Sequence, residues 1–386
     1  MYRNAYVEVD NSIIEANARY MCENFPHKYN IAVIKGNAYG HGYGIVPALI
    51  RGGMNAFAVS KLEEALEVRK YDTSHPVIML QPVRPEFLHV LAENNISACV
   101  NDCDTFEAIK NSGEALKLQF KVNSGMNRLG FSDGEKLREA VEYSFASDKL
   151  SVEGIFTHFH SNGLRDTEYA RDKKRFEDIT SGIDLSKIPM VHVDRTQTVF
   201  LHDTPEYANG ARIGVSLFGF STIYPYADTL KGKLRKLQRE FENRKNGVEP
   251  CKPLRTYDVK PAFTLYTEVI QVNKVKAGDY VGYGLLHKAE KDEYIAVIDI
   301  GYADGINRKR IHSKVAINGV KYEIIGEVGM GMCEVLVDNT VKKYDKVTVL
   351  GGDIPISSIT PHVGTTMYEL LTNIDTQIPR IYKEKA

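Results

Sequence analysis

The stretch IAVIKGNAYGHGYG, residues 31–44, decides the fold. Residues 31–34 form a short apolar run, which is typical of a β-strand buried on both faces, and Lys35 follows that run directly. After the lysine, glycines alternate with polar and aromatic residues, so the backbone can turn tightly while Tyr39 and Tyr43 stay near it. The pattern predicts that a buried strand carries one amine at its C-terminal end.

A lysine in that position suits chemistry on carbonyl groups. Desolvation favours the neutral amine, which can attack a carbonyl carbon and form a Schiff base. A glycine-rich loop with a solvated lysine would give the same pattern, so the stretch alone leaves both interpretations open. A P-loop for nucleotide phosphates is not supported, because Lys35 precedes the glycines and no Gly-Lys-Ser/Thr sequence follows.

Length and charge favour a two-domain protein that acts on small molecules. The 386 residues include 49 basic and 50 acidic ones, with a net charge of -1, so we expect neither a nucleic-acid nor a membrane partner. The five cysteines form no C-x-x-C pair, and we therefore expect no disulfide, no metal site and a reducing, cytoplasmic location. Residues 1–10 lack the apolar core of a signal peptide, which agrees with that location.

The first part of the chain alternates between buried strands and amphipathic helices. The expected strands are 31–34, 56–60, 77–80, 97–100, 118–123, 152–159, 190–194 and 211–218, and the expected helices include 62–70, 104–112, 135–145 and 168–183. A further helix should start at the capping residues 10–12. Eight such units in about 220 residues predict an α/β fold, a (β/α)8 TIM-type barrel with its active site at the C-terminal ends of the strands.

The pattern changes after residue 228. We expect the barrel domain over 1–228, a basic, mobile and partly helical linker over 229–260, and a mostly β domain over 261–386. The strands expected in the β domain are 263–275, 293–301, 314–317, 322–328 and 347–351. Asn318-Gly319, between two of them, predicts a type I′ hairpin.

Polar residues stand at the ends of several expected barrel strands. They are Lys35, Lys121, Asn123, Thr157, His158, His192, Asp194 and Arg212, and Arg128 lies in the loop after the fifth strand. Each of them alone is more often structural. Because parallel strands bring their C-terminal ends together, we expect these side chains to converge at one mouth of the barrel.

An ordered set of motifs makes this expectation specific. The motifs are residues 31–44, KVNSGMNRLGF at 121–131, THF at 157–159, ARIGVSLFG at 211–219, VGYG at 281–284, IGYADG at 300–305 and TTMYELL at 365–371. In this order, and over nearly the whole chain, they resemble the alanine racemases, which are pyridoxal-phosphate enzymes of fold type III. The resemblance implies pyridoxal 5′-phosphate as the cofactor, an isomerase activity, and a supply of D-alanine for peptidoglycan.

The resemblance also implies two catalytic bases. Lys35 and Tyr283 would each act on one face of the substrate α-carbon, with His158 and Arg212 beside them. A free tyrosine has a pKa of about 10, so positive charge from Arg212, relayed by His158, would favour the Tyr283 phenolate. In the family the two bases come from different subunits, which implies an obligate homodimer with a shared active site.

Other residues would bind the cofactor or the substrate. The implied cofactor-binding set is Lys35, Tyr39, Tyr43, His158, Thr196, Arg212, Gly214, Val215 and Tyr368, and the implied substrate-binding set is Arg128, Tyr302 and Met330. Arg212 would face the pyridine nitrogen and, because an arginine keeps its proton, would leave that nitrogen unprotonated. Lys121 matches a lysine that is often carbamylated in the family.

Two departures from the family pattern leave the substrate open. Arg195 replaces an uncharged residue near the expected phosphate site, and Gly331 replaces a carboxylate residue next to Met330. Interconversion of L-alanine and D-alanine is our first expectation, and serine, ornithine or lysine are alternative substrates. A fold type III decarboxylase of basic amino acids and a protein that binds pyridoxal phosphate without catalysis are the remaining alternatives.

Overall fold

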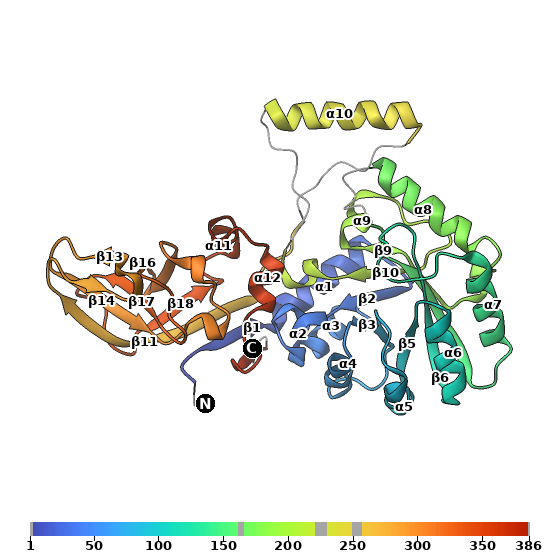
Figure 1. The fold of residues 1–386 in the computed structure, drawn as a ribbon, viewed down its shortest axis with the longest axis horizontal. Coiled ribbons are helices and arrows are strands. Elements are labelled where there is room, and N and C mark those ends of the chain that lie inside the picture. Colours follow the sequence, from blue (N-terminus) through green and yellow to red (C-terminus); the bar gives the residue numbers. More distant parts are fainter. Residues whose placement is uncertain (1–2, 161–165, 221–229, 249–256, 385–386) are drawn as a thin grey trace. The chain divides into compact units, whose positions relative to one another are not determined.

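The computed structural model describes residues 3–160, 166–220, 230–248 and 257–384. Contacts divide the chain into two compact units, and Figure 1 shows the elements of both. The barrel unit consists of Ile14–Lys35 and Val46–Lys260, and the β unit consists of Met1–Ile13, Gly36–Ile45 and Pro261–Ala386. Among the described residues, no helix is long and apolar enough to cross a membrane.

A closed parallel sheet forms the centre of the barrel unit. Its strands are β2 (Tyr29–Val33), β3 (Ala56–Val59), β4 (Val77–Met79), β5 (Ile96–Val100), β6 (Leu116–Val122), β7 (Leu150–Thr157), β8 (Met190–His192), β9 (Asp194–Arg195) and β10 (Gly210–Ile213). They are hydrogen bonded in the order β8-β7-β6-β5-β4-β3-β2-β10-β9. β8 and β9 are consecutive pieces of one segment, interrupted only at Val193, so the sheet closes on itself. This confirms the predicted TIM-type barrel.

Helices alternate with these strands along the chain. They are α1 (Asn11–Asn24), α3 (Val46–Arg51), α4 (Leu62–Arg69), α5 (Leu88–Glu93), α6 (Cys103–Ser112), α7 (Gly134–Phe145), α8 (Asp166–Thr180) and α9 (Thr196–Leu201). As predicted, α1 begins at a capping residue, because Asp10 Oδ1 accepts the Ser12 N–H at 2.9 Å. The four helices predicted between the strands are also present, with ends that differ by a few residues.

Two predicted strands differ in form from the expectation at their C-terminal ends. The strand expected over 211–218 ends at Ile213, because Gly214 (φ −119°, ψ −101°) turns the chain into the short 3-10 helix η4 (Val215–Phe218). The strand expected over 190–194 is interrupted at Val193. Both changes lie at the C-terminal mouth of the barrel, where the backbone leaves the sheet to present side chains.

The basic part of the expected linker forms one continuous helix, α10 (Leu230–Asn246), which agrees with the partly helical character that we expected there. Its 17 residues consist mostly of lysine, arginine, leucine, glutamate and glutamine, which are strong helix formers, and its single glycine lies near the start. The remainder of the expected linker between residues 249 and 256 lies outside the described residues.

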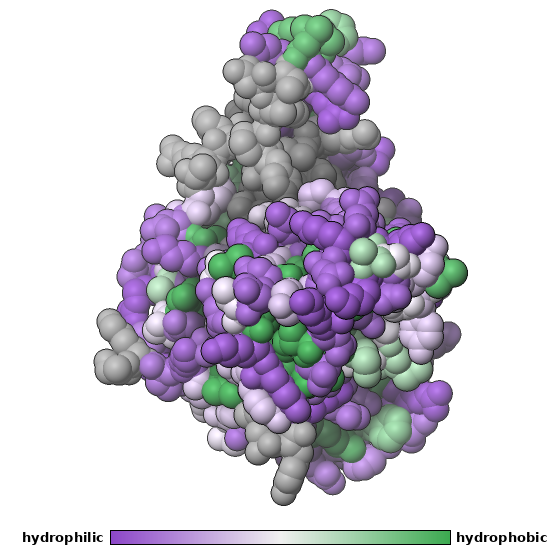
Figure 2. Space-filling view, turned by 90° about the vertical axis from the view of Figure 1, so that its left-hand side faces the viewer, coloured by the Kyte–Doolittle hydropathy of each residue, from purple (hydrophilic) through white to green (hydrophobic). Residues whose placement is uncertain are grey.

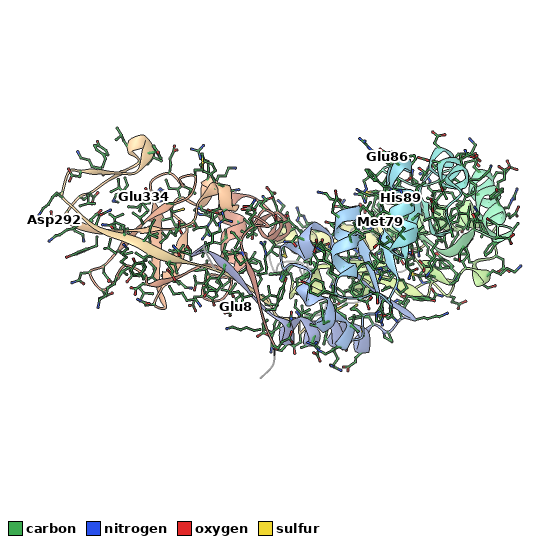
Figure 3. The ribbon with its side chains drawn as sticks, turned by 90° about the horizontal axis from the view of Figure 1, so that it is seen from below. Glu8, Met79, Glu86, His89, Asp292 and Glu334 are labelled. Atoms are coloured by element: carbon green, nitrogen blue, oxygen red, sulfur yellow. The ribbon has the colours of Figure 1, made fainter. Side chains whose placement is uncertain are left out.

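The β unit is built on an eight-stranded sheet. Its strands are β1 (Tyr6–Asp10), β11 (Phe263–Val275), β14 (Glu293–Ile298), β15 (Lys314–Ile317), β16 (Val320–Ile325), β17 (Cys333–Val337), β18 (Lys346–Leu350) and β19 (Arg380–Lys383), in the order β14-β17-β16-β15-β18-β11-β1-β19. An additional pairing of β14 with β11 closes the first six into a small barrel. Figure 3 shows Glu8 on β1 and Glu334 on β17 in this unit. A mostly β second domain is thus confirmed.

The predicted hairpin at Asn318-Gly319 is also confirmed. Ile317 on β15 pairs with Val320 on β16, so the two residues between them make the whole turn. Asn318 and Gly319 have φ values of 51° and 80°, as a type I′ turn requires.

The first strand differs from the expected domain division. β1 lies in the β unit, where Tyr6 pairs with Tyr266 of β11 and Val7 with Arg380 of β19, whereas we expected residues 1–228 to form the barrel domain. Val7 and Val9 are completely buried and alternate with partly exposed neighbours, a pattern typical of a strand that buries one face of its sheet. The boundaries at 228 and 260 stay a prediction.

Candidate active site

Lys35 directly follows the first strand of the barrel unit. The N–H of the preceding residue, Ile34, donates to the carbonyl of Ala58 at 3.0 Å, which continues the ladder between β2 and β3 up to the lysine. Desolvation lowers the pKa of Lys35, and the nearby guanidinium groups of Arg128 and Arg212 lower it further. This environment favours the neutral amine more than water does, which fits the first of the two interpretations that the sequence left open.

Arg212 lies inside the barrel at the start of a buried hydrogen-bond chain. Its Nη1 is 2.9 Å from His192 Nδ1, His192 Nε2 is 3.0 Å from Gln119 Oε1, and Gln119 Nε2 donates to Glu153 Oε2 at 2.9 Å. Arg212 also donates to the carbonyl oxygens of His192 and Thr157. Burial lowers the pKa of Arg212 to about 10, so the guanidinium still carries its charge at neutral pH.

This chain fixes the protonation of His192. An arginine can only donate, so Nδ1 of His192 must accept and its proton sits on Nε2, which donates to Gln119. Burial and the charge of Arg212 hold the pKa of His192 well below its usual range, so the ring stays neutral. The amide of Gln119 then connects the ring to the carboxylate of Glu153.

Our sequence reasoning did not find Gln119 or Glu153. Side chains along a strand alternate between its two faces, so Gln119, two residues before Lys121 on β6, faces the same side of the sheet as Lys121. This alternation was the signal that could have identified Gln119. What the sequence could not provide was the register that places Gln119 opposite Gly154, the residue after Glu153.

Lys121 is buried near the same mouth. Its Nζ donates to the carbonyl of Leu80 at 3.0 Å and lies 5.3 Å from the ring centroid of Phe156, over which Arg212 also lies at 5.5 Å. Burial lowers the pKa of Lys121 to about 8. The neutral amine needed for carbamylation is therefore accessible near physiological pH.

His158 and Arg128 lie beyond the ends of two neighbouring strands. His158 follows β7 and is half-buried, and desolvation together with the charges of Arg195, Arg212, Arg128 and Lys35 holds its pKa well below the usual range. The electrostatic interaction of His158 with these four cations indicates that they share one region of the unit. Arg128 is exposed in the loop after β6.

Thr196 and Gly214 meet at the junction of β9 and β10. The N–H of Gly214 donates to Oγ1 of Thr196 at 3.0 Å, and both residues are buried. Val215, another residue of the implied cofactor-binding set, begins η4 directly after Gly214. Three residues that the family resemblance implies for cofactor binding are thus brought together.

The turn after Lys35 is left-handed and belongs to the β unit. Residues 36–40, most of which are labelled α2 (Lys35–Tyr39) in Figure 1, all have positive φ, and the N–H of Gly40 donates to the carbonyl of Gly36 at 3.0 Å. Three of these five residues carry side chains, which costs about 1–2 kcal/mol per residue. Sustained strain of this kind is concentrated at functional sites.

Tyr39 and Tyr368 are neighbours in the β unit. Their ring centroids are 6.0 Å apart, and Tyr368 lies on helix α12 (Met367–Thr372). Burial, and to a lesser extent the electrostatic effect of the neighbouring Tyr368, raises the pKa of Tyr39. Tyr43 is buried in the same unit, so the three predicted tyrosines lie in one compact body.

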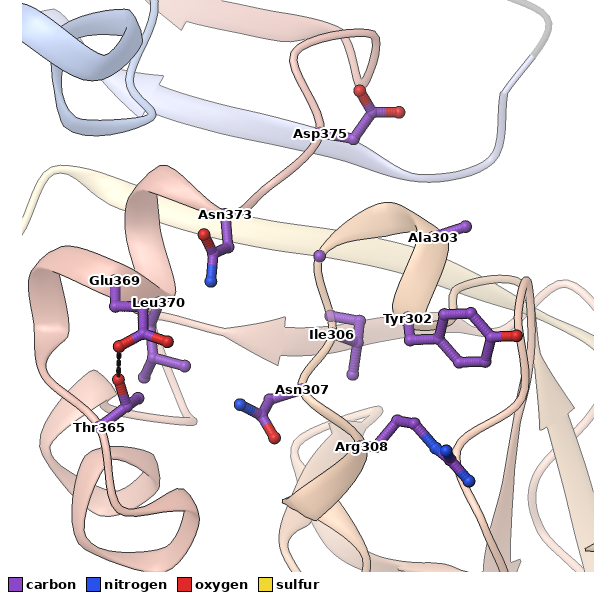
Figure 4. Close-up of a pocket in the computed structure, with 11 residues that line it drawn as sticks. Tyr302, Ala303, Ile306, Asn307, Arg308, Thr365, Glu369, Leu370, Asn373 and Asp375 are labelled. Atoms are coloured by element: carbon purple, nitrogen blue, oxygen red, sulfur yellow. Dashed lines mark hydrogen bonds between the residues drawn. The ribbon is translucent and has the colours of Figure 1, made fainter.

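Tyr283, Tyr302 and Met330 lie on the surface of the β unit, with exposed fractions of 73%, 42% and 64%. Tyr302 and Met330 are close, because the N–H of Tyr302 donates to the carbonyl of Gly329, and that of Ala303 to the carbonyl of Met330, both at 2.9 Å. Tyr302 also lines a pocket of about 520 Å³ with polar walls, which include Asn307, Arg308 and the hydrogen-bonded pair Thr365 and Glu369 (Figure 4).

Comparison with known proteins assigns the chain to a family. Family models described as the N-terminal and C-terminal domains of alanine racemase match residues 9–222 and 262–382. Alanine racemase from Geobacillus kaustophilus (strain HTA426) is 30% identical over 391 residues, covering 99% of this chain and 95% of that relative. Alanine racemase 1 from Bacillus subtilis (strain 168) is 28% identical over 394 residues, covering 100% of this chain and 94% of the relative.

Solved structures agree with this assignment. Alanine racemase from E. faecalis superposes with a TM-score of 0.84 at 28% identity and covers 99% of both chains. Histidine racemase from Leuconostoc mesenteroides subsp. sake has the same fold, with a TM-score of 0.83 at 24% identity, covering 99% of this chain and 98% of the other. The fold and these relatives define a two-domain amino acid racemase. The chain belongs to the alanine racemase family.

Proposed function

We propose that the protein interconverts the L and D forms of alanine with pyridoxal 5′-phosphate as its cofactor, supplying D-alanine for the cell wall from the cytoplasm. The observation that carries the cofactor assignment is Lys35, an amine of lowered pKa at the end of a barrel strand. Family membership supports the substrate, because the two relatives described above are alanine racemases.

The residues of the barrel unit fit this cofactor. Thr196 would offer a hydroxyl to an anionic phosphate, and the turn at Gly214 and Val215 would offer backbone N–H groups; the contact between Thr196 and Gly214 supports this proposal. Arg212 offers the ring nitrogen a donor that does not give up its proton. In the β unit, Tyr43 and Tyr368 would offer further hydroxyl groups for the phosphate, and Tyr39 belongs to the expected cofactor-binding set.

When bound, the cofactor withdraws electrons from the substrate α-carbon and so acidifies its hydrogen. Arg128 would bind the substrate carboxylate, which fixes the orientation of the α-carbon. On one face of that carbon, Lys35 Nζ would remove or return the proton, and on the other face Tyr283 Oη would do the same. Racemisation requires both groups, because the proton must leave from one face and another must arrive on the opposite face.

We further propose that the active site is shared between the subunits of a homodimer. Tyr283 is 73% exposed on the β unit, although a catalytic base works best in a site closed to water. A second subunit that covers Tyr283 and contributes the cofactor lysine would remove this difficulty.

A second candidate is the racemisation of a larger amino acid, namely serine, ornithine or lysine. The supporting observation is Gly331, next to the exposed Met330, where an added Cβ would meet no atom within 4 Å. Space that a carboxylate side chain occupies in the family is therefore open in this unit. If that space faces the substrate, it would admit a longer side chain.

One experiment tests both candidates. Purified protein is incubated with pyridoxal phosphate in heavy water, and each enantiomer of alanine, serine, ornithine and lysine is assayed for α-hydrogen exchange and inversion. We expect the protein to invert alanine. The matched control, Lys35→Ala, should show no inversion. If the rate of inversion is highest with another amino acid, that amino acid is the substrate instead of alanine. Loss of the carboxyl group would indicate a decarboxylase. A yellow protein that exchanges nothing would refute catalysis altogether.

A further inference from the structure

Helix α10 carries its large apolar side chains on its outer surface. Leu230, Leu234, Leu237 and Phe241 are 78%, 58%, 60% and 68% exposed. Their spacing of four, three and four residues places them in one stripe along the helix. In Figure 2, hydrophobic and hydrophilic residues lie together on this helix at the top of the view.

The opposite side of α10 is polar and attached to the barrel unit. Arg239 Nε and Asn243 Nδ2 donate to Asp166 Oδ2 at 2.8 and 2.5 Å, and Asp166 is a buried carboxylate at the start of α8. Gly232 lies on the same side and is also buried. At 3.6 residues per turn, these three residues lie roughly opposite the apolar stripe. The usual orientation of an amphipathic surface helix, with its apolar face inward, is therefore reversed.

The charge of α10 differs strongly from that of the whole chain. The helix contains seven basic residues and two acidic ones, a net charge of +5, whereas the full chain has a net charge of -1. Basic residues border the stripe on both sides, with Lys231 and Lys245 on one and Lys233 and Arg244 on the other. Long basic side chains at such borders can reach anionic groups while their stems stay in apolar surroundings.

We propose that α10 binds to the surface of an anionic lipid bilayer. The apolar stripe would enter the boundary between headgroups and acyl chains, and the bordering lysines and arginines would contact lipid phosphates. Association with a second copy of α10 would use the same stripe, but it would bring together two helices that each carry +5. Charge therefore favours the lipid surface, although the nearly neutral whole chain had led us to expect no membrane partner. The proposal does not depend on which amino acid the enzyme uses.

The test uses the full chain with its cofactor and vesicles of phosphatidylcholine with or without one part in four of phosphatidylglycerol. We expect sedimentation with the anionic vesicles only, and release at high salt. The variant Leu234→Gln/Leu237→Gln/Phe241→Gln should bind at least tenfold more weakly, with unchanged turnover in solution. The matched control is Phe145→Gln, since Phe145 is 48% exposed on α7 of the same unit, and it should bind like the parent.

The absence of tryptophan from the chain permits a second measurement. In Phe241→Trp the only tryptophan reports on the stripe, and its emission should shift to shorter wavelength with anionic vesicles and be quenched by brominated lipid. Tyr143→Trp, at a position 46% exposed on α7, should not respond.

Three results would overturn the proposal. The first is no binding to anionic vesicles at low salt. The second is binding that the stripe variant leaves unchanged, which would indicate general attraction to polyanions. The third is a lipid-free oligomer, seen by sedimentation velocity, that the stripe variant dissociates while neither parent nor variant binds vesicles, because a second copy would then cover α10.

Discussion

Gly40 in the left-handed turn should tolerate no side chain. A Cβ built there lies 2.1 Å from the carbonyl oxygen of Leu371 on α12, a distance that real Cβ contacts do not reach. Gly364 provides a matched control in the same unit, because it also has positive φ, +71° against +82°, but a Cβ there meets nothing within 4 Å. The two glycine-to-alanine variants share the backbone penalty and differ in the clash.

The expected magnitudes follow from this difference. Alanine at positive φ costs about 1 kcal/mol after allowance for the stiffer unfolded chain, and this is the whole effect expected for Gly364→Ala. In Gly40→Ala the turn and α12 must also separate by about 1 Å, and overpacking of this kind adds about 1–3 kcal/mol. Since α12 carries Tyr368, the same displacement should weaken cofactor binding in Gly40→Ala alone.

Urea unfolding at fixed protein concentration measures the first effect, and titration with pyridoxal phosphate followed by visible absorbance measures the second. We expect Gly40→Ala to lose about 2–4 kcal/mol of unfolding free energy, against about 1 kcal/mol for Gly364→Ala. Equal losses in both variants would show that the contact with Leu371 costs nothing, and the reasoning would be refuted. Unchanged cofactor affinity in a destabilised Gly40→Ala would refute the link to Tyr368.

Three further predictions concern the barrel unit and the dimer. Gln119→Leu should cost about 1–3 kcal/mol in urea unfolding, because the N–H of His192 loses its buried acceptor; a loss below about 0.5 kcal/mol would mean that water replaces the amide. Because burial lowers the pKa of Lys121 to about 8, its neutral amine predominates above that pH. At fixed dissolved carbon dioxide, a carbamate NMR signal from labelled bicarbonate should therefore grow as the pH rises through 8 and be missing in Lys121→Arg; the same signal in that variant would assign it elsewhere. Mixing inactive Lys35→Ala with a Tyr283→Phe variant should restore about a quarter of the parent activity, since half of the dimers become mixed and each holds one intact site. No recovery after verified subunit exchange would argue against a shared site.

The barrel was predictable because its strands are short apolar runs separated by amphipathic helices. Buried parallel strands need no alternation, so runs such as residues 56–59 stand out from the sequence. The hairpin was predictable for a similarly local reason, because the pair Asn318-Gly319 alone specifies the turn. Strand ends then gave the barrel-mouth candidates, because the C-terminal ends of parallel strands meet at one face.

Non-local pairings were not predictable. β1 resembles any short strand, and its partners lie more than 250 residues further along the chain. β17 was missed because glycines and methionines precede its alternating CEVLV pattern. The chain from Arg212 to Glu153 was hidden for a related reason: four residues from different strands must be placed in register before their hydrogen bonds can be seen.

The position of β1 has a consequence for the order of synthesis. In sequence, the barrel unit lies between β1 and β11 of the β unit, which also contributes residues 36–45. A ribosome releases β1 first and β19 last, and these two strands pair in parallel. The barrel strands can fold while the chain is still growing, but the sheet of the β unit is completed only when the last residues are synthesised. A nascent chain arrested before β19 would therefore hold a folded barrel and an unfinished sheet, with Val7 and Val9 open to chaperones.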